Sequence, residues 1–208
     1  MKADGIIFDL DGTLWDSTEN VAKSWNQELL AMGYSELGAA DFKACMGLPM
    51  DELFERLFPG ADRGELRRLQ ERLYAAENAY METHGGVLYE GLEDTLNALK
   101  GKYKLAVVSN CQAGYIEAFM KAHGLEAYFD DFESLGGTGL LKAGNIRLVA
   151  DRNHLQYPVY VGDIQGDCDS AHEAGAAMIY AAYGFGKVVG AEAVIHTITE
   201  LPGILEPA

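Results

Sequence analysis

Two aspartates two residues apart, Asp9 and Asp11, come directly after the apolar run Gly5-Ile6-Ile7-Phe8. Carboxylates at the end of a buried strand are costly unless they bind a cation or take part in a reaction. Two other interpretations exist. The Asp-x-Asp-Gly sequence can form a polar turn. It can also begin an EF-hand loop, although such a loop follows a helix and has glycine where Leu14 stands. The pair alone does not decide between these interpretations.

Polar side chains follow other apolar runs of the chain as well. Ser109 and Asn110 follow a second run, and their hydroxyl and amide groups could donate hydrogen bonds to a phosphate oxygen. Asp163 and Asp167 follow a third run and add two carboxylates. Lys142 comes after a glycine-rich segment and begins a helical pattern. A lysine in that position is often a solvated helix residue, but it can also supply the positive charge that an anion needs.

The elements that must position these residues are short apolar runs rich in β-branched residues, at positions 5–8, 105–108, 159–161, 178–180 and 194–195. Because the runs are continuous rather than alternating, they predict strands buried on both faces of a parallel sheet. Helical patterns lie between the later runs, which predicts βαβ units and a doubly wound α/β fold.

The carboxyl ends of parallel strands meet at one edge of a sheet, so we expect the polar groups to gather there. Four carboxylates opposed by a single lysine favour a divalent hard cation with oxygen ligands, and Mg²⁺ above the others.

One stretch, from about Asp16 to His84, breaks the alternation of strands and helices. Its pattern contains no strand and several amphipathic helices, among them one in which Val21, Trp25 and Leu29 share an apolar face. The first strand cannot form a sheet alone, so we interpret this stretch as a helical subdomain inserted into the α/β core. The alternative is a set of surface helices continuous with that core.

Composition excludes several classes of protein. The 208 residues are 49% hydrophobic and 23% charged, as in globular proteins rather than disordered chains. With 32 acidic against 16 basic residues the formal net charge is −16, and Arg67-Arg68 is the only adjacent basic pair, so we expect no nucleic-acid partner. No apolar run approaches the roughly 20 residues that cross a bilayer. The start of the chain resembles no secretory signal, which makes a cytoplasmic location the default expectation.

Cysteine and histidine patterns indicate neither a disulfide framework nor a zinc site. The three cysteines are an odd number without Cys-x-x-Cys spacing. The five histidines show no ligand spacing. Cys111 lies beside Asn110 and could line the pocket, but we expect it to be a small packed residue.

The ordered motifs from Asp9 to Asp167 resemble the haloacid dehalogenase (HAD) superfamily, most of whose members transfer phosphoryl groups. All four motifs of that superfamily occur in order, and the resemblance spans nearly the whole chain. It implies an α/β catalytic core of residues 1–15 and 85–208, with a helical cap of the C1 type at residues 16–84.

The resemblance also implies a Mg²⁺-dependent phosphatase that hydrolyses a small phosphate monoester. Asp9 matches the nucleophile that forms an aspartyl-phosphate. Asp11 matches the general acid that protonates the leaving oxygen and then, as a base, activates water. Ser109, Asn110 and Lys142 match the phosphate-binding groups.

The same resemblance implies the metal ligands. Asp163 matches a direct Mg²⁺ ligand, together with the Asp9 carboxylate and the Asp11 backbone carbonyl. Asp167 matches the second acidic position, which reaches the metal through water or orients its neighbours. The chain departs from the family pattern after Lys142, where Ala143-Gly144-Asn145 stands in place of the common Pro-x-Pro.

Alternatives within and outside the superfamily remain. Dehalogenases lack the carboxylate of Asp11, whereas sugar phosphomutases often have Val at the position of Thr13 and a Gly-x-Ser-Arg cap loop. Here that loop reads Gly47-Leu48-Pro49-Met50, which is closer to phosphoglycolate phosphatase-like members. A non-enzymatic nucleotide-binding module would use the glycines at 184–190, but their spacing misses G-x-G-x-x-G and predicts a turn. The physiological ester and the choice between monomer and homodimer stay undecided.

Overall fold

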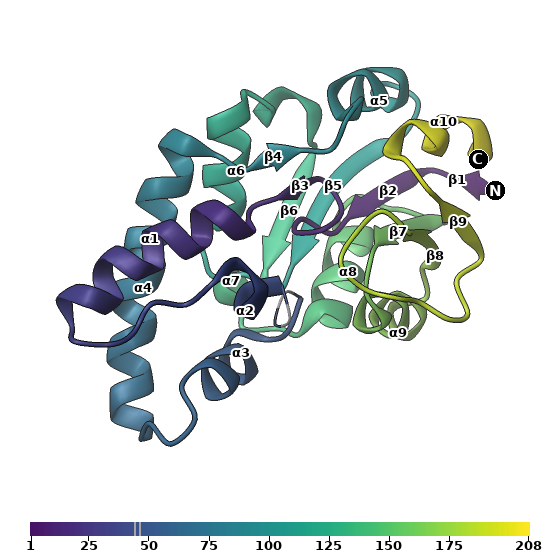
Figure 1. Cartoon of the computed structure of the whole chain (residues 1–208). Coiled ribbons are helices and arrows are strands. Elements are labelled where there is room, and N and C mark those ends of the chain that lie inside the picture. The colour runs from purple at the N-terminus through teal and green to yellow at the C-terminus, as the bar shows by residue number, and fades with distance from the viewer. Residues whose placement is uncertain (44, 46) are drawn as a thin grey trace.

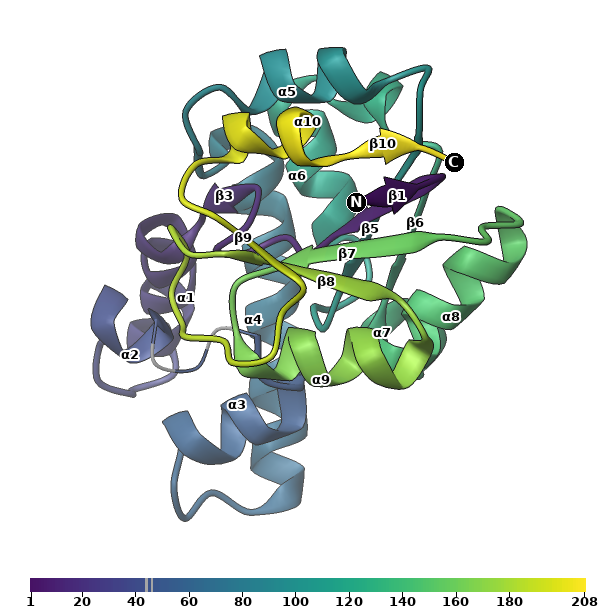
Figure 2. The ribbon, with the colours of Figure 1, turned by 90° about the vertical axis from the view of Figure 1, so that its right-hand side faces the viewer.

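A six-stranded parallel sheet forms the centre of the computed structural model, which describes residues 1–43, 45 and 47–208 (Figures 1 and 2). In spatial order its strands are β6 (Asp131–Ser134), β5 (Lys104–Ser109), β2 (Gly5–Phe8), β7 (Pro158–Gly162), β8 (Ala177–Ala181) and β9 (Ala193–Ile195). The first of these strands in the chain, β2, lies between β5 and β7, so the strand order reverses beside it. Such a switch point is where doubly wound folds bind ligands.

Helices cover both faces of this sheet, as Figure 2 shows. On one side lie α5 (Leu92–Leu99), α6 (Tyr115–His123) and α10 (Leu201–Ile204); on the other lie α7 (Leu135–Thr138), α8 (Lys142–Arg152) and α9 (Gln165–Ala174). Alternate strand residues belong to different hydrophobic clusters, Ile6 and Phe8 to one and Ile7 to the other. Both faces are therefore buried, and the predicted doubly wound α/β fold is confirmed.

Four helices form a block on the left of Figure 1, which we call the helical block: α1 (Thr18–Ala31), α2 (Ala39–Lys43), α3 (Met50–Leu57) and α4 (Arg63–His84). Its buried hydrophobic residues belong to the same hydrophobic cluster as one face of the sheet. Trp25 of α1 packs between Phe42 and Phe54, with ring centroids 5.1 and 5.0 Å away. The chain enters and leaves the block through an antiparallel pair of short strands, β3 (Trp15–Asp16) and β4 (Val87–Leu88).

The five runs that the sequence predicts as strands all lie in the sheet, but its edge strand β6 does not follow from the sequence pattern. Its sequence, Asp-Phe-Glu-Ser, is mostly polar because the strand pairs with β5 on one side only and three of its four residues are at least partly exposed. The short pair β1 (Lys2–Ala3) and β10 (Glu206–Pro207) was also unpredicted, and it brings the two termini together. The glycine-rich segment 184–190 forms bends between β8 and β9, as the sequence predicts.

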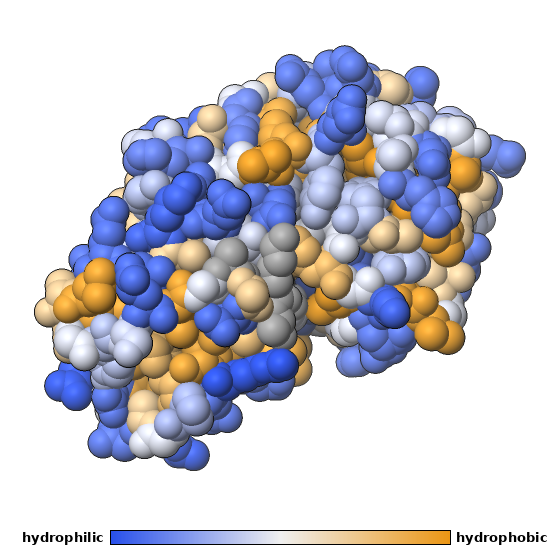
Figure 3. Space-filling model, viewed as in Figure 1, coloured by the Kyte–Doolittle hydropathy of each residue, from blue (hydrophilic) through white to orange (hydrophobic). Residues whose placement is uncertain are grey.

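The surface is mostly hydrophilic, as the number of charged residues in the sequence leads one to expect. In the face shown in Figure 3 hydrophilic residues cover most of the area and hydrophobic residues occur in smaller patches. No helix among the described residues is both long and apolar enough to cross a membrane.

The burial of β5 gives a prediction about stability. Leu105 is fully buried in this strand, whereas Leu30 on α1 is 55% exposed. We expect Leu105→Ala to lower the free energy of unfolding by about 2–5 kcal/mol, because it leaves a cavity between the sheet and its helices. The matched change Leu30→Ala should alter it by less than about 0.5 kcal/mol. Urea denaturation of both variants measures the difference, and equal losses would contradict this description of the core.

Candidate active site

Three neighbouring strands carry the predicted site residues to the switch point of the sheet. Asp9 follows β2, Ser109 ends β5 and Asp163 follows β7, and β5 and β7 both pair with β2 in parallel register. Lys142 comes from a different place, the first residue of α8. Residues that lie far apart in the sequence therefore meet at one edge of the sheet, as predicted.

Asp9, Asp163 and Asp167 form a buried acidic cluster. One carboxylate oxygen of each lies within 4.8 Å of the others, and none of the three residues is more than 2% exposed. Burial, the charge of Asp167 and that of Asp163 raise the pKa of Asp9 well above its ordinary value. Burial and the charge of Asp167 also raise the pKa of Asp163, to about 7. The cluster thus holds more negative charge than its protein surroundings balance.

Lys142 extends into this cluster and pairs with two of its members. Its Nζ lies 2.9 Å from Asp9 Oδ1 and 2.5 Å from Asp167 Oδ1. Burial alone would lower the pKa of Lys142, but the charges of Asp167 and Asp9 outweigh it and raise the pKa above the ordinary value. The lysine is therefore a buried ammonium ion, not a solvated helix residue.

Asp167 has both of its carboxylate oxygens engaged. Oδ1 accepts a hydrogen bond from Lys142, and Oδ2 accepts from the backbone N–H groups of Asp163 and Ile164, at 2.9 and 3.1 Å. Because it is held by three donors, Asp167 fixes the lysine and the loop that carries Asp163.

Asn145 lies in the segment after Lys142, where the common family pattern has prolines, and its side chain bonds to the turn before α8. Its side-chain amide donates to the Leu140 carbonyl at 2.9 Å and accepts from the Thr138 hydroxyl at 2.7 Å. Fully buried, Asn145 ties the turn before α8 to the first turn of that helix. Sequence reasoning missed this role. The available signal was a polar residue at position 145, between the small residue Ala143 and the apolar Ile146 on the buried side of the helix.

Asp11 lies beside the cluster in a different environment. Its Oδ1 accepts hydrogen bonds from the Trp15 indole at 2.9 Å, the Ser17 hydroxyl at 2.5 Å and the Tyr115 hydroxyl at 3.2 Å. Burial raises the pKa of Asp11 to about 6, although these donors oppose the shift. A carboxyl group with a pKa near neutrality can both give and accept a proton.

Two glycines allow the backbone to approach Asp163 closely. Gly12 has a φ of +85°, and a Cβ atom there would lie 2.3 Å from Asp163 Oδ2; a Cβ atom at Gly184 would lie 2.3 Å from the Asp163 Cβ. The next residue, Phe185, donates its backbone N–H to Asp163 Oδ2 at 2.7 Å. The bends after β8 thus orient this carboxylate, a contribution that the glycine spacing did not reveal.

Ser109 and Asn110 lie where the helical block contacts the sheet edge. Ser109 is buried, and the Asn110 side-chain amide donates to the Gly47 carbonyl of the helical block at 3.0 Å. The Asn110 Oδ1 is buried and lacks a hydrogen-bond partner in the part of the chain that the structure describes. A Cβ atom at Gly47 would lie 2.3 Å from Ile164 Cδ1, so this turn of the helical block fits closely against the loop after β7.

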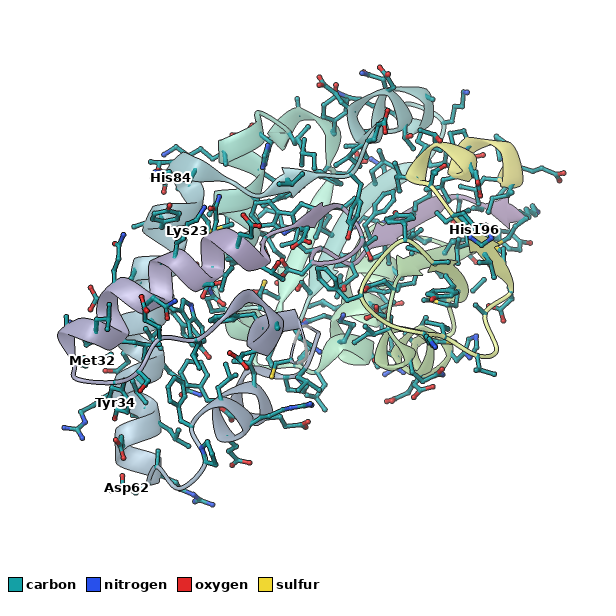
Figure 4. All side chains as sticks on the ribbon, in the orientation of Figure 1. Lys23, Met32, Tyr34, Asp62, His84 and His196 are labelled. Atoms are coloured by element: carbon teal, nitrogen blue, oxygen red, sulfur yellow. The ribbon has the colours of Figure 1, made fainter. Side chains whose placement is uncertain are left out.

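The residues present fit a divalent cation. Three carboxylates opposed by one ammonium group leave a formal excess of two negative charges among side chains that are almost fully buried. All the ligand atoms offered are carboxylate oxygens, which Mg²⁺ prefers over nitrogen or sulfur donors. Histidines do not contribute to this cluster, and Figure 4 shows His84 and His196 far apart in the molecule, on the helical block and beyond β9.

Known proteins resemble this chain in both sequence and fold. The family of haloacid dehalogenase-like hydrolases matches residues 6–181. The chain is 30% identical to a phosphoglycolate phosphatase of Rhodobacter capsulatus, over 98% of this chain and 97% of that protein. It is also 30% identical to a phosphoglycolate phosphatase of Nitrosospira multiformis, over 88% and 84%. A crystal structure described as a predicted phosphoglycolate phosphatase from Haemophilus somnus has the same fold, with a TM-score of 0.85 at 22% identity and 97% of both chains covered.

The crowding of carboxylates gives a prediction about metal binding. Adding Mg²⁺ to protein stripped with EDTA should raise its Tm, because the cation relieves the repulsion within the cluster. Asp163→Asn keeps the shape of the side chain but removes one charge, so this variant should lose most of the rise. The exposed Asp151 supplies the matched control, and Asp151→Asn should respond like the unchanged protein. Thermal unfolding with and without Mg²⁺ tests this, and an equal rise in all three proteins would exclude the cluster as the site.

Proposed function

The chain belongs to the haloacid dehalogenase-like hydrolase family, and from that premise we propose that it hydrolyses small phosphate monoesters with the help of Mg²⁺, through an aspartyl-phosphate on Asp9. The phosphoglycolate phosphatase relatives make the chain a phosphatase, that is, a phosphoric monoester hydrolase. The observation that carries the finer proposal is the pairing of Asp9 with Lys142 at 2.9 Å, beside a second carboxyl group whose pKa lies near neutrality.

In the first half of the reaction a carboxylate oxygen of Asp9 attacks the phosphorus atom, and the bond between phosphorus and the leaving oxygen breaks. Asp11 gives its proton to that oxygen, so that the product leaves as a neutral alcohol. The donors on Asp11 Oδ1 hold the carboxyl group in place during this transfer.

In the second half water attacks the phosphorus atom of the aspartyl-phosphate, and Asp11 accepts a proton from the water. The bond between phosphorus and the Asp9 oxygen breaks, which releases inorganic phosphate and restores both carboxyl groups. Because Asp11 leaves the first half deprotonated, it is ready to act as the base.

Lys142, Ser109 and Asn110 would bind the phosphoryl oxygens. Lys142 supplies a positive charge, whereas the Ser109 hydroxyl and the Asn110 amide supply hydrogen-bond donors. The Asn110 amide contacts the Gly47 carbonyl at 3.0 Å, so it would exchange this partner for the substrate.

Mg²⁺ would be held by the carboxylates of Asp9 and Asp163 and by the Asp11 backbone carbonyl, while Asp167 keeps Lys142 and the Asp163 loop in position. When bound, the cation offsets the repulsion between the phosphate dianion and the Asp9 carboxylate.

Residues 16–84 would act as a cap over a catalytic core of residues 1–15 and 85–208. The two crossings between them run side by side as the pair β3 and β4. Gly85 and Gly86 lie next to this pair, and Gly85 has a φ of +62°, so the crossing has a backbone position suited to a hinge.

The two aspartates should fail differently when each is changed to asparagine. Asp9→Asn removes the nucleophile, so turnover should fall to background and no phosphoprotein should form. Asp11→Asn removes the acid and base, which should lower turnover about 10²–10⁴-fold. The loss should be smaller for p-nitrophenyl phosphate, whose leaving group needs little protonation.

Intact-protein mass spectrometry after mixing with substrate separates the two variants. Asp11→Asn should accumulate a phosphate adduct, because water attack on the intermediate is slowed. EDTA should abolish the turnover of the unchanged protein. Normal turnover by Asp9→Asn would show that the nucleophile is assigned to the wrong residue.

The role of Asn145 gives a second prediction. Asn145→Ala releases the turn before α8, and the resulting shift of Lys142 should lower kcat/KM about 10–100-fold, mainly through KM. Asn153 ends the same helix and bonds to Asp131 and the Val149 carbonyl. Asn153→Ala should therefore leave kcat/KM unchanged. Steady-state kinetics of both variants decide the matter, and equal effects would exclude a positioning role for Asn145.

A further inference from the structure

A cavity of about 40 Å³ lies between the helical block and the sheet edge. Asp11 and Ser109 line it from the α/β core, and Trp25, Leu53 and Glu77 line it from the helical block. Asp11 is the group that protonates the leaving oxygen in the proposed reaction, so the leaving group must extend into this space. The space is small, so it favours a short leaving group over a bulky one.

Glu77 is the one buried carboxyl group that the described part of the helical block contributes to this cavity. It lies on α4 in line with the buried Leu69, Leu73 and Met81, and only 4% of it is exposed. The Trp25 indole donates to its Oε2 at 2.6 Å. Burial raises the pKa of Glu77 to about 8, although the hydrogen bonds from Trp25 and Gln112 oppose the shift. A carboxyl group is seldom fully buried on an apolar helix face without a partner or a function.

The described residues that line the cavity include no lysine, arginine or histidine. The positive charge of the site, Lys142, is bound to Asp9 and Asp167 at the phosphate end. A leaving group with a carboxylate or a second phosphate would therefore bring its charge into apolar surroundings that already hold Asp11 and Glu77. If Glu77 is ionised it repels this charge, and if it is neutral no cation compensates the lost hydration.

A hydroxyl group on the leaving alcohol brings no charge into these apolar surroundings. It can donate to or accept from the Glu77 carboxyl, whose two oxygens have capacity beyond the bonds from Trp25 and Gln112. The carboxyl group then needs no counter-ion. An ammonium group would need an ionised Glu77, and both charges would lose hydration among the largely apolar side chains of the cavity.

We propose that Glu77 selects the substrate: this chain hydrolyses phosphate monoesters of short, uncharged alcohols that carry a second hydroxyl group, and it discriminates against leaving groups that carry a carboxylate. The inference rests on the proposed hydrolysis and deepens it. It concerns the leaving group alone and leaves the proposed chemistry at phosphorus unchanged.

Four phosphate esters that share a two-carbon chain test this selection. 2-Hydroxyethyl phosphate, ethyl phosphate, 2-aminoethyl phosphate and phosphoglycolate differ in the polar group at the end of that chain. We expect kcat/KM to be highest for 2-hydroxyethyl phosphate, by about 10-fold over ethyl phosphate and by about 100-fold or more over phosphoglycolate. A preference for phosphoglycolate or for 2-aminoethyl phosphate would overturn the proposal, and so would equal rates for the hydroxyethyl and ethyl esters.

Variants at position 77 separate selection from a purely structural role. Glu77→Gln keeps the size and the hydrogen bonding but cannot ionise, and its amide can donate to a carboxylate. It should raise kcat/KM for phosphoglycolate relative to 2-hydroxyethyl phosphate at least about 10-fold. Glu77→Leu should bring the hydroxyethyl and ethyl esters to similar rates, because it removes the hydrogen bond.

Leu69 provides the structural control. It lies about two turns before Glu77 on the same buried face of α4, but it does not line the cavity. Leu69→Ala should leave the ratios among the four esters unchanged even though it lowers stability. Equal changes of ratio in the Leu69 and Glu77 variants would assign Glu77 a structural role only.

The p-nitrophenyl ester distinguishes failure of this inference from failure of the proposed function. If p-nitrophenyl phosphate is hydrolysed and phosphoglycolate is the best of the four esters, the function stands and the selection is wrong. If no ester is hydrolysed in the presence of Mg²⁺, the proposed function is wrong and the inference fails with it.

Discussion

The excess of buried negative charge at the end of β2 is the constraint on which the rest of the site depends. Two unit charges about 4 Å apart interact by roughly 4 kcal/mol at an effective dielectric constant near 20. Three carboxylates within 4.8 Å of one another therefore need compensation, and Lys142 provides only part of it. In the proposed reaction the site receives a cation and an anion together, because each lowers the electrostatic cost of binding the other.

The fold supplies this arrangement through topology and close backbone approach. The switch point beside β2 brings three strand ends together, and α8 delivers the lysine from outside the sheet. Gly12 and Gly184 let two loops reach Asp163 at distances that a side chain would prevent. Asn145 then fixes the turn that carries Lys142. Helices and strands bring the charged groups to one place, and Gly12, Gly184 and Asn145 determine how closely the loops around those groups approach one another.

Much of this could be predicted from the sequence because it depends on local signals. Continuous apolar runs identify β2, β5 and β7, and the polar residues directly after them identify the edge where Asp9, Ser109 and Asp163 meet. The edge strand β6 could not be predicted, because exposure makes its sequence polar. The role of Asn145 could not be predicted either, because it depends on the folded turn that brings Thr138 and Leu140 next to its side chain. Glu77 was hidden for a similar reason, since a charged residue within an apolar helical pattern is ordinarily assigned to the solvent side.

The phosphoryl end and the leaving-group end of the candidate active site are constrained by the reaction to different degrees. In the proposed function the groups that hold the phosphoryl end come from the strand ends of the core and from the start of α8. The chemistry of phosphoryl transfer restricts them to carboxylates, a lysine and hydrogen-bond donors. The leaving-group end is lined by residues of α1, α2, α3 and α4, where the reaction restricts only size and charge. Similarity to phosphatases over the whole chain is therefore stronger evidence for the reaction than for the substrate. A single buried carboxyl group on α4 can change the preferred leaving group without altering any residue that contacts the phosphorus atom.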